Sequence, residues 1–218
     1  MKIRPAMVAF RRGLTRIVFT ATLCSSGSSA PDQWLILLPP HSGVITASTT
    51  RRDLVNRFGA RNVSDGDIDV GEGETAPGTT VFAGDSTRAV EILWKDPKTK
   101  RSPDTLTIKG KASRWKAVHG ISLGTSLKDL ERINGKPFVL FGFGWDYSGT
   151  VYSWENGVLS KDFEGHGSVI LRLDTDLVPP NLPEPDYDHV SGDASFSSSN
   201  PAMQNINPRV YEILWKFP

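Results

Sequence analysis

Two segments of the chain share one pattern of apolar and polar positions. ITASTTRRDLVNRFG occupies residues 45–59 and ISLGTSLKDLERING occupies residues 121–135, and the two align without a gap. In each segment a hydroxyl residue stands three positions before an aspartate, a form of the helix capping box in which Asp replaces Glu or Gln. The pairs are Thr50 with Asp53 and Ser126 with Asp129. Each segment is therefore predicted to hold a short capped helix that ends at its final glycine.

Runs rich in β-branched and aromatic residues follow each predicted helix. TTVFAGD (residues 79–85) and AVEILWKD (residues 89–96) are predicted to pair as neighbouring strands, and DTLTIKG (residues 104–110) is predicted to add another. SVILRLD (residues 168–174) is the strand predicted in the second half. No regular βαβ alternation separates these runs, so the pattern predicts antiparallel pairing.

A further hairpin is predicted in VYSWENGVLSKD, residues 151–162. Asn156 and Gly157 suit the two positive-φ positions of a type I′ turn. The residues facing each other would be Trp154 with Leu159 and Tyr152 with Lys161. Trp154 is expected on the core side of its sheet.

The C-terminus repeats a strand from the first half of the chain. RAVEILWKD at residues 88–96 recurs as RVYEILWKF at residues 209–217. Together with the repeated helix pattern, this recurrence favours two related helix-plus-sheet units. They would cover residues 31–112 and 113–218, the second with a proline-rich surface loop over residues 177–208. The predicted fold class is α+β with antiparallel sheets.

Aromatic and small residues alternate at the start of the stretch 141–154. The aromatic positions are Phe141, Phe143, Trp145 and Tyr147, and the small or polar positions are Gly142, Gly144, Asp146 and Ser148. On a strand this gives an aromatic face and a nearly bare face, which the helix at residues 127–133 would be able to approach closely. The aromatic face is either a second core or an exposed binding surface. The predicted binding residues are Phe143, Trp145, Asp146 and Tyr147.

Residues 1–30 have the order typical of a secretory signal. Five basic residues and no acidic residue precede the apolar run IVFTATLC, and small residues follow up to Ala30. This order predicts an exported protein, periplasmic or secreted, that begins near Pro31. The alternatives are a disordered basic tail and an outer-membrane lipoprotein attached through Cys24, for which Leu23 is large at the preceding position.

Composition excludes several kinds of chemistry. Cys24 is the only cysteine, so a chain cut after Ala30 has no disulfide and no thiol nucleophile. Without the five basic residues of the signal, 20 basic and 24 acidic residues remain, and the net charge changes from +1 to −4. Such a chain lacks the electrostatic footprint of a nucleic-acid-binding protein. No apolar run approaches the roughly 20 residues that a membrane-spanning helix needs.

The acidic run SDGDIDVGEGE imitates the start of a calcium loop through Asp65, Asp67 and Asp69. A calcium loop of this kind needs glycine at its sixth position and glutamate at its twelfth, where Val70 and Ala76 stand. A solvated acidic turn is therefore preferred over a weak cation site. The four histidines lack metal-ligand spacing, and no hydrolase or nucleotide-binding motif occurs, so no catalytic residue, metal or cofactor is predicted.

Three resemblances to known families bear on function. GISLGTSLKDLERINGKPF, residues 120–138, followed by predicted hairpins, resembles the helix-then-sheet unit of the SmpA/OmlA (BamE-like) outer-membrane assembly lipoproteins. Tandem copies of that unit are similar to the architecture of the β-lactamase inhibitory proteins. GEGETAPGTTVF, INGKPF and GFGWDYSGTV resemble an uncharacterised family of secreted bacterial proteins, over most of residues 40–218. The first two resemblances imply an exported protein that binds other proteins, and the third implies no function.

From these features we expect an exported, non-enzymatic module of the bacterial cell envelope that binds a protein partner. The alternative is an envelope hydrolase or glycan-binding protein that uses residues 141–154, with acids such as Asp146 and Glu155 beside the aromatic rings. Paired carboxylates about 5–9.5 Å apart across a groove would favour the enzyme. An exposed aromatic surface without such a pair would favour binding.

Overall fold

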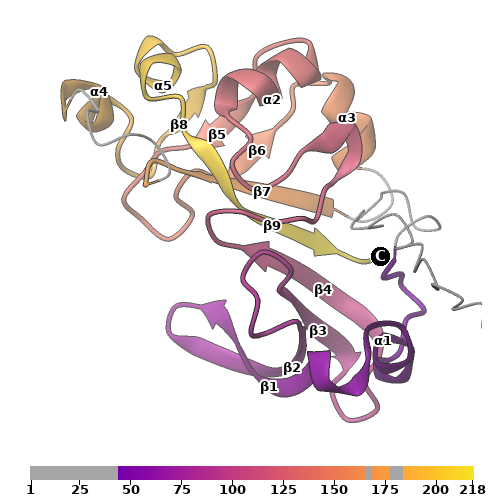
Figure 1. Ribbon diagram of the computed structural model, residues 1–218. Helices are drawn as coiled ribbons and strands as arrows, with labels where there is room; N and C mark the ends of the chain where they lie inside the picture. The colour runs from indigo at the N-terminus through magenta and orange to yellow at the C-terminus, as the bar shows by residue number, and fades with distance from the viewer. Residues whose placement is uncertain (1–43, 165–167, 177–183) are drawn as a thin grey trace, which may run out of the picture. The chain divides into compact units, whose positions relative to one another are not determined.

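Residues 44–164, 168–176 and 184–218 are described by the structure, a computed structural model (Figure 1). All of them belong to one unit of the chain, Gln33–Pro218. The predicted export signal and Cys24 lie outside the described residues. Within the described part of the chain, no helix is long and apolar enough to cross a membrane.

The first half of the described chain is a helix followed by four strands. The elements are α1 (Arg51–Phe58), the 3-10 turn η1 (Ala60–Asn62), β1 (Val63–Gly71), β2 (Glu74–Val81), β3 (Val90–Asp96) and β4 (Arg101–Lys109). The predicted capping box is present: the Thr50 side chain accepts a hydrogen bond from the Asp53 N–H, and the Asp53 carboxylate accepts one from the Thr50 N–H. These bonds satisfy N–H groups that the first turn leaves free, so the helix begins at Arg51.

The second half alternates short helices with short strands. The elements are η2 (Val118–Gly120), α2 (Leu127–Asn134), β5 (Val139–Phe141), β6 (Val151–Ser153), α3 (Val158–Phe163), β7 (Ser168–Asp174), α4 (Glu184–His189), β8 (Ser195–Ser197), α5 (Pro201–Ile206) and β9 (Arg209–Lys216). Ser126 caps α2 by accepting from the Asp129 N–H, and Gly135 ends the helix in the left-handed conformation. Both capped helices are therefore confirmed.

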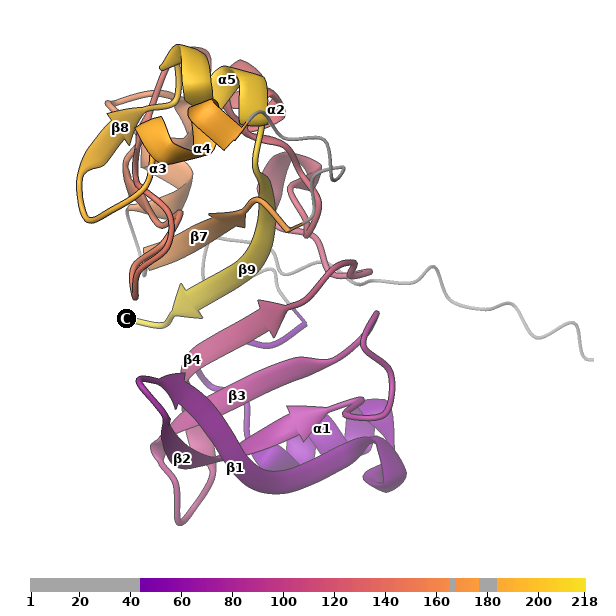
Figure 2. The same cartoon turned by 90° about the vertical axis from the view of Figure 1, so that its left-hand side faces the viewer.

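The strands form two antiparallel sheets. The larger has the order β1-β2-β3-β4-β9-β7, and the smaller has the order β6-β5-β8. Figure 2 looks onto one face of the larger sheet, with α1 behind it. The predicted strands at residues 104–110 and 168–174 and the pairing of β2 with β3 are present. The α+β fold class with antiparallel sheets is confirmed.

The larger sheet crosses the boundary predicted near residue 112. β4 of the first half pairs with β9 of the second, from Thr105 opposite Lys216 to Lys109 opposite Glu212. Beyond β9, β7 completes the sheet. The two halves of the chain thus share one hydrogen-bonded ladder.

The predicted duplication holds for the helix caps, but two equivalent units are not confirmed. β3 and β9, which carry the repeated sequence, lie on either side of β4, and Ile92, Leu106 and Trp215 form one row across the three strands. β3 is followed along the chain by β4, its neighbour in the sheet. β9 also lies beside β7 in the sheet, but α4, β8 and α5 separate these two strands along the chain. The order of strands around the two copies therefore differs.

One hydrophobic core joins helices from both halves to the larger sheet. Leu54 of α1, Leu130 of α2 and Leu159 of α3 belong to the same buried cluster as Ile92 and Trp215. Full burial of a leucine or isoleucine contributes about 1.5–3 kcal/mol. Removal of either half would therefore expose core of the other half.

The hairpin predicted for residues 151–162 is wrong. β6 ends at Ser153 and α3 begins at Val158, so Leu159 and Lys161 lie in a helix. The positive-φ residues are Glu155 and Asn156, at 53° and 56°, one position before the predicted pair Asn156 and Gly157, and the Gly157 N–H donates to the Trp154 carbonyl across them at 2.9 Å. Gly157 has a φ of −75° and serves as the N-cap of α3.

A buried side chain from α2 explains why α3 replaces the second strand. Asn134 accepts a hydrogen bond from the Leu159 N–H at 3.1 Å and donates to the Trp154 and Lys136 carbonyls at 3.0 Å each. It supplies the capping acceptor that Gly157, having no side chain, lacks. The contact joins residues 25 positions apart, so the sequence around Gly157 does not predict it.

The predicted proline-rich loop contains regular structure. α4, β8 and α5 all lie between residues 184 and 208, whereas residues 177–183 lie outside the described residues. Asn200 caps α5 by accepting from the Ala202 N–H at 2.8 Å, and Pro201 occupies the first helical position. Proline suits that position because it has no N–H to leave unbonded.

Candidate binding surface

The predicted aromatic strand ends at Phe141. Residues 142–150, which we call the aromatic loop, connect β5 to β6. Gly144 and Gly149 have positive φ values of 86° and 63°, which a continuing strand does not allow. The predicted division of this stretch into one aromatic face and one bare face is therefore wrong.

Hydrogen bonds within the aromatic loop fix its shape. The Trp145 indole N–H donates to the Gly142 carbonyl at 3.1 Å. The Ser148 N–H donates to the Trp145 carbonyl, and the Thr150 N–H donates to the Tyr147 carbonyl, both at 3.0 Å. These bonds give the loop a defined conformation.

Arg172 of β7 holds the aromatic loop to the larger sheet. Its Nε donates to Thr150 Oγ1 at 3.1 Å, its Nη2 donates to the Asp146 carbonyl at 3.3 Å, and its Nη1 donates to Glu212 Oε2 at 3.3 Å. Burial raises the pKa of Glu212, and the Arg172 charge opposes that rise. One guanidinium group therefore connects the loop to β7 and β9.

Two glycines of the loop permit close backbone contacts. A Cβ atom on Gly149 would lie 1.8 Å from the Leu173 carbonyl oxygen of β7, and one on Gly142 would lie 2.6 Å from the Gly192 carbonyl oxygen. The Leu173 N–H donates to the Gly149 carbonyl at 2.9 Å. The expectation that the helix at residues 127–133 approaches these glycines is therefore wrong, because β7 and the segment after α4 do so.

Four aromatic rings from the loop and its flanking strands form a surface group, which we call the aromatic cluster: Phe141, Trp145, Tyr147 and Tyr152. The Phe141 centroid lies 5.4 Å from those of Trp145 and Tyr152 and 6.5 Å from that of Tyr147. Tyr147 is 52% exposed and Tyr152 is 68% exposed, whereas Phe141 and Trp145 are partly buried. The two partly buried rings therefore support two that project into solvent.

The predicted binding residues separate into two groups. Trp145 and Tyr147 belong to the aromatic cluster, and Asp146 between them is exposed. Phe143 is only 2% exposed, and its ring stacks on that of Tyr187 at 6.1 Å. Phe143 is a core residue, so its assignment to a binding surface does not fit its position.

The predicted binding residues leave out Phe141 and Tyr152, which also belong to this surface. The sequence predicts Tyr152 in a hairpin opposite Lys161, and that hairpin does not form. The density of aromatic residues between 141 and 154 is the signal that includes both rings. Trp154 does lie on the core side as predicted: it is 3% exposed and its ring centroid is 4.9 Å from that of Phe138.

The ring angles limit what the aromatic cluster can bind. The planes of contacting rings meet at 53° to 86°. Such rings present edges as well as faces and make an uneven surface instead of one flat platform. This arrangement suits interdigitating side chains better than a single flat ring.

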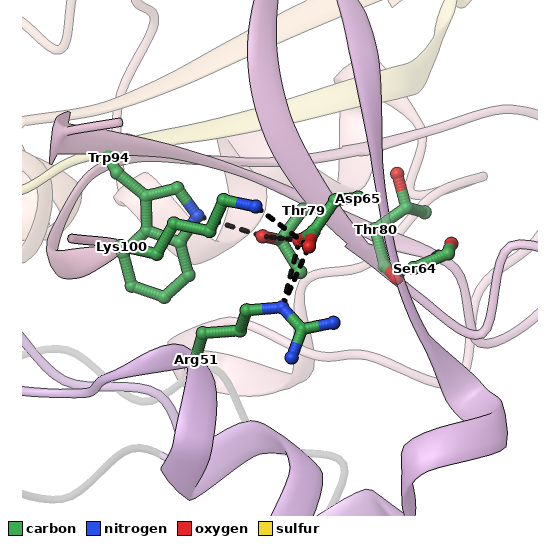
Figure 3. A network of polar contacts seen from close by, with 7 residues as sticks. All are labelled: Arg51, Ser64, Asp65, Thr79, Thr80, Trp94 and Lys100. Carbon is green, nitrogen blue, oxygen red and sulfur yellow. Dashed lines mark hydrogen bonds and ion pairs between the residues drawn. The ribbon is translucent and has the colours of Figure 1, made fainter. Parts of the chain in front are cut away.

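Asp65, the first aspartate of the calcium-like run, lies in a network of polar contacts (Figure 3). Its carboxylate accepts from Arg51 Nε at 2.9 Å, from Lys100 Nζ at 2.7 Å and from Thr79 Oγ1 at 2.8 Å. Thr79 Oγ1 in turn accepts from the Trp94 indole N–H at 2.9 Å. Burial acts to raise the pKa of Asp65, but the hydrogen bonds from Lys100, Arg51 and Thr79 outweigh it and lower the pKa.

Most of the acidic run lies in a strand, and only Glu72 and Gly73 form a turn. Residues 63–71 are β1, and the chain reverses at Glu72 and Gly73 before β2. Two cations of the protein already compensate the Asp65 charge, so this carboxylate takes part in the fold. Within the described residues, no group of three or more His, Cys, Asp or Glu side chains is arranged to hold a metal ion.

Of the histidines, His119 contacts an acid: its Nε2 lies 2.7 Å from Asp162 Oδ2 of α3. Both side chains are partly exposed, at 41% and 34%. The pair links η2 to α3. His41 and His166 lie outside the described residues.

Comparison of the chain with protein-family models, with curated proteins and with solved structures found no match.

Proposed function

We propose that the protein is a non-enzymatic binding module of the bacterial cell envelope and that its aromatic cluster binds a protein partner. The observation that carries the proposal is the exposure of Tyr147 and Tyr152, 52% and 68%, beside a loop with a fixed backbone. Placement in the envelope is supported by the order of residues 1–30.

Burial of the exposed tyrosine rings by a partner would contribute favourable free energy to binding. Covering about 100 Å² of each tyrosine would contribute roughly 2.5 kcal/mol per ring, at about 25 cal/mol per Å². Tyrosine and tryptophan are also the residues most enriched among the few that dominate protein–protein affinity. The aromatic cluster combines both residue types.

The fixed loop lowers the entropic cost of binding. The Trp145 indole N–H is bonded within the loop, and Arg172 holds the loop from the sheet side. A partner would therefore not have to order the backbone, and immobilising a side chain costs about 0.5–1.5 kcal/mol. Preorganisation of this kind supports a binding role for the cluster.

A protein partner is favoured over a glycan by the tilt of the rings. Tyr147 and Tyr152 both lie at more than 50° to the Phe141 ring, so the cluster does not offer one continuous flat face. After β6, the Glu155 carboxylate accepts a hydrogen bond from Ser153 Oγ at 2.7 Å within its own turn. The glycan-binding alternative is an outcome of the test below.

The test is site-specific photocrosslinking in the native cells. A photoreactive phenylalanine analogue replaces Tyr152, and the matched control carries it at Val158 of α3, which is 48% exposed. We expect a discrete protein adduct from position 152 that Trp145→Ala reduces by about tenfold, the loss expected for a binding residue worth about 1.4 kcal/mol.

Three outcomes would contradict the proposal. The first is the absence of any adduct from position 152, and the second is an adduct of equal yield from position 158. The third is an adduct with carbohydrate alone, which would assign the cluster to glycan binding.

A further inference from the structure

β1 is an edge strand of the larger sheet. It stands first in the strand order, and within the described residues it pairs with β2 alone. The strand is nine residues long. Its outer side therefore carries a row of backbone N–H and C=O groups without a strand partner, a ready template for another strand.

The register identifies which backbone groups point outward. The Phe82 N–H donates to the Asn62 carbonyl at 2.7 Å, one step beyond the pairing of Val63 with Val81. Hydrogen-bonded and non-hydrogen-bonded pairs alternate along an antiparallel ladder. The residues that direct both N–H and C=O away from β2 are therefore Val63, Asp65, Asp67 and Asp69.

The outward-facing positions carry negative charge, and cations of the described residues form ion pairs with only part of it. Arg51 and Lys100 neutralise Asp65, whereas Asp67 and Asp69 are exposed farther along the strand. The turn that follows adds Glu72, which is also exposed. A strand that pairs here is favoured if it carries positive charge and disfavoured if it carries negative charge.

The charge selects among possible occupants of the edge. A second copy of the chain, paired through the same edge, would place aspartates opposite aspartates, which is unfavourable in a sheet. An extended segment with lysine or arginine at alternate positions would bring opposite charges together. Its side chains would lie on the same side of the sheet as those of Asp67 and Asp69.

We propose that the outer edge of β1, from Asp65 to Asp69, binds an extended basic segment of a partner protein by β-strand addition. Main-chain hydrogen bonds to Asp65, Asp67 and Asp69 provide the affinity, and the exposed carboxylates select a basic sequence. The surface is separate from the aromatic cluster, so the inference goes beyond the proposed function. Aspartates on an edge strand can also serve only to prevent pairing with other sheets. The test below therefore distinguishes an edge that binds a strand from an edge whose charges prevent any pairing.

The test measures backbone amide exchange in the full chain. The probe is a capped seven-residue peptide of alternating lysine and threonine, and its matched control alternates glutamate and threonine. We expect the lysine peptide, at saturation, to slow exchange of the Asp67 and Asp69 N–H groups by about tenfold or more, since they gain a hydrogen-bond partner. The Ile68 N–H, which faces β2, should change little.

Two substitutions separate backbone pairing from charge. Asp67→Pro removes an N–H that points away from β2, so it leaves the existing ladder intact and should abolish protection by the peptide. Asp67→Asn keeps the N–H and removes the charge, so it should weaken peptide binding by about three- to tenfold.

The inference is overturned if the lysine peptide leaves the exchange of Asp67 and Asp69 unchanged, even where it shifts their resonances, because that result shows ion pairing alone. Equal protection by the glutamate peptide would overturn the basic selectivity. If Asp67→Pro fails to fold, the exchange pattern of the unaltered chain and the Asp67→Asn affinity still decide the matter.

Discussion

At the residue scale, two polar side chains determine local structure from a distance. Asn134 of α2 caps α3, and Asp65 contacts Arg51 at the start of α1, Lys100 in the turn before β4 and Thr79 near the end of β2. Neither role was predicted. Each depends on residues 14 or more positions away, which a reading based on neighbouring residues does not include.

Asn134→Ala should lower the free energy of unfolding by about 1–3 kcal/mol. The substitution leaves the buried Leu159 N–H without its acceptor, whereas the Trp154 carbonyl loses one of two donors and keeps the Gly157 N–H at 2.9 Å. Urea denaturation checks this, with Asn56→Ala on the exposed side of α1 as the control expected to stay within about 0.5 kcal/mol. Equal effects of the two substitutions would contradict the role given to Asn134.

Asp65→Asn should cost about 1–2 kcal/mol at neutral pH, because it removes the charge that Arg51 and Lys100 share. The pKa of Asp65 is lowered in the folded chain, so its contribution is complete above the unfolded value of about 4 and is lost as the pH falls through the folded pKa. The difference in stability between the two proteins should therefore shrink as the pH falls below about 4. A difference that stays constant as the pH falls further would show that the carboxylate charge is not the cause.

At the element scale, the sequence predicted elements that local patterns determine. The capping hydroxyls located α1 and α2, and the alternation of SVILRLD located β7 over the same residues, Ser168–Asp174. The predictions failed where tertiary contacts outweighed local preference. Asn156 and Gly157 did not form the predicted turn because Asn134 caps a helix there. The predicted aromatic strand ended at Phe141, and the loop that follows it packs against Leu173 of β7 at Gly149.

Gly149→Ala should destabilise the aromatic loop by about 2–4 kcal/mol. The new Cβ atom would meet the Leu173 carbonyl oxygen at 1.8 Å, and the φ of 63° is itself unfavourable for alanine. Gly144→Ala is the matched control: its φ of 86° is also positive, but the nearest atom to its Cβ is 3.7 Å away, so the cost should be about 1 kcal/mol. Thermal denaturation distinguishes the two, and a larger loss for Gly144→Ala would show that the contact with β7 is wrongly placed.

At the scale of the whole molecule, one sheet and one hydrophobic core extend across residue 112, where the sequence predicted a boundary between two units. Recurring motifs predicted two units, but the pairing of β4 with β9 and the common buried cluster depend on strand order that no local pattern reveals. The aromatic cluster, too, depends on tertiary structure that local patterns do not reveal. Its residues were partly predicted from composition, whereas the division into buried Phe143 and exposed Tyr152 follows from the path of the loop.

The chain from Gln33 onward should unfold in a single cooperative transition. Unfolding of either half would expose the β4–β9 ladder and the shared core, so neither half is expected to persist alone. Calorimetric and van't Hoff enthalpies should agree, and near- and far-ultraviolet circular dichroism should give one midpoint. Two separated transitions would instead support independent units divided near residue 112.

The central claim is that the two exposed tyrosines of the aromatic cluster, Tyr147 and Tyr152, contribute to binding and not to folding. The most direct measurement follows the double substitution Tyr147→Ser with Tyr152→Ser, using a photoreactive phenylalanine analogue at exposed Asp146 to report the bound partner. We predict that the free energy of unfolding changes by less than about 1 kcal/mol and that the yield of protein adduct falls by about tenfold or more. An unchanged adduct yield, or a loss of stability of the 3–5 kcal/mol expected for Trp154→Ala, would contradict the account.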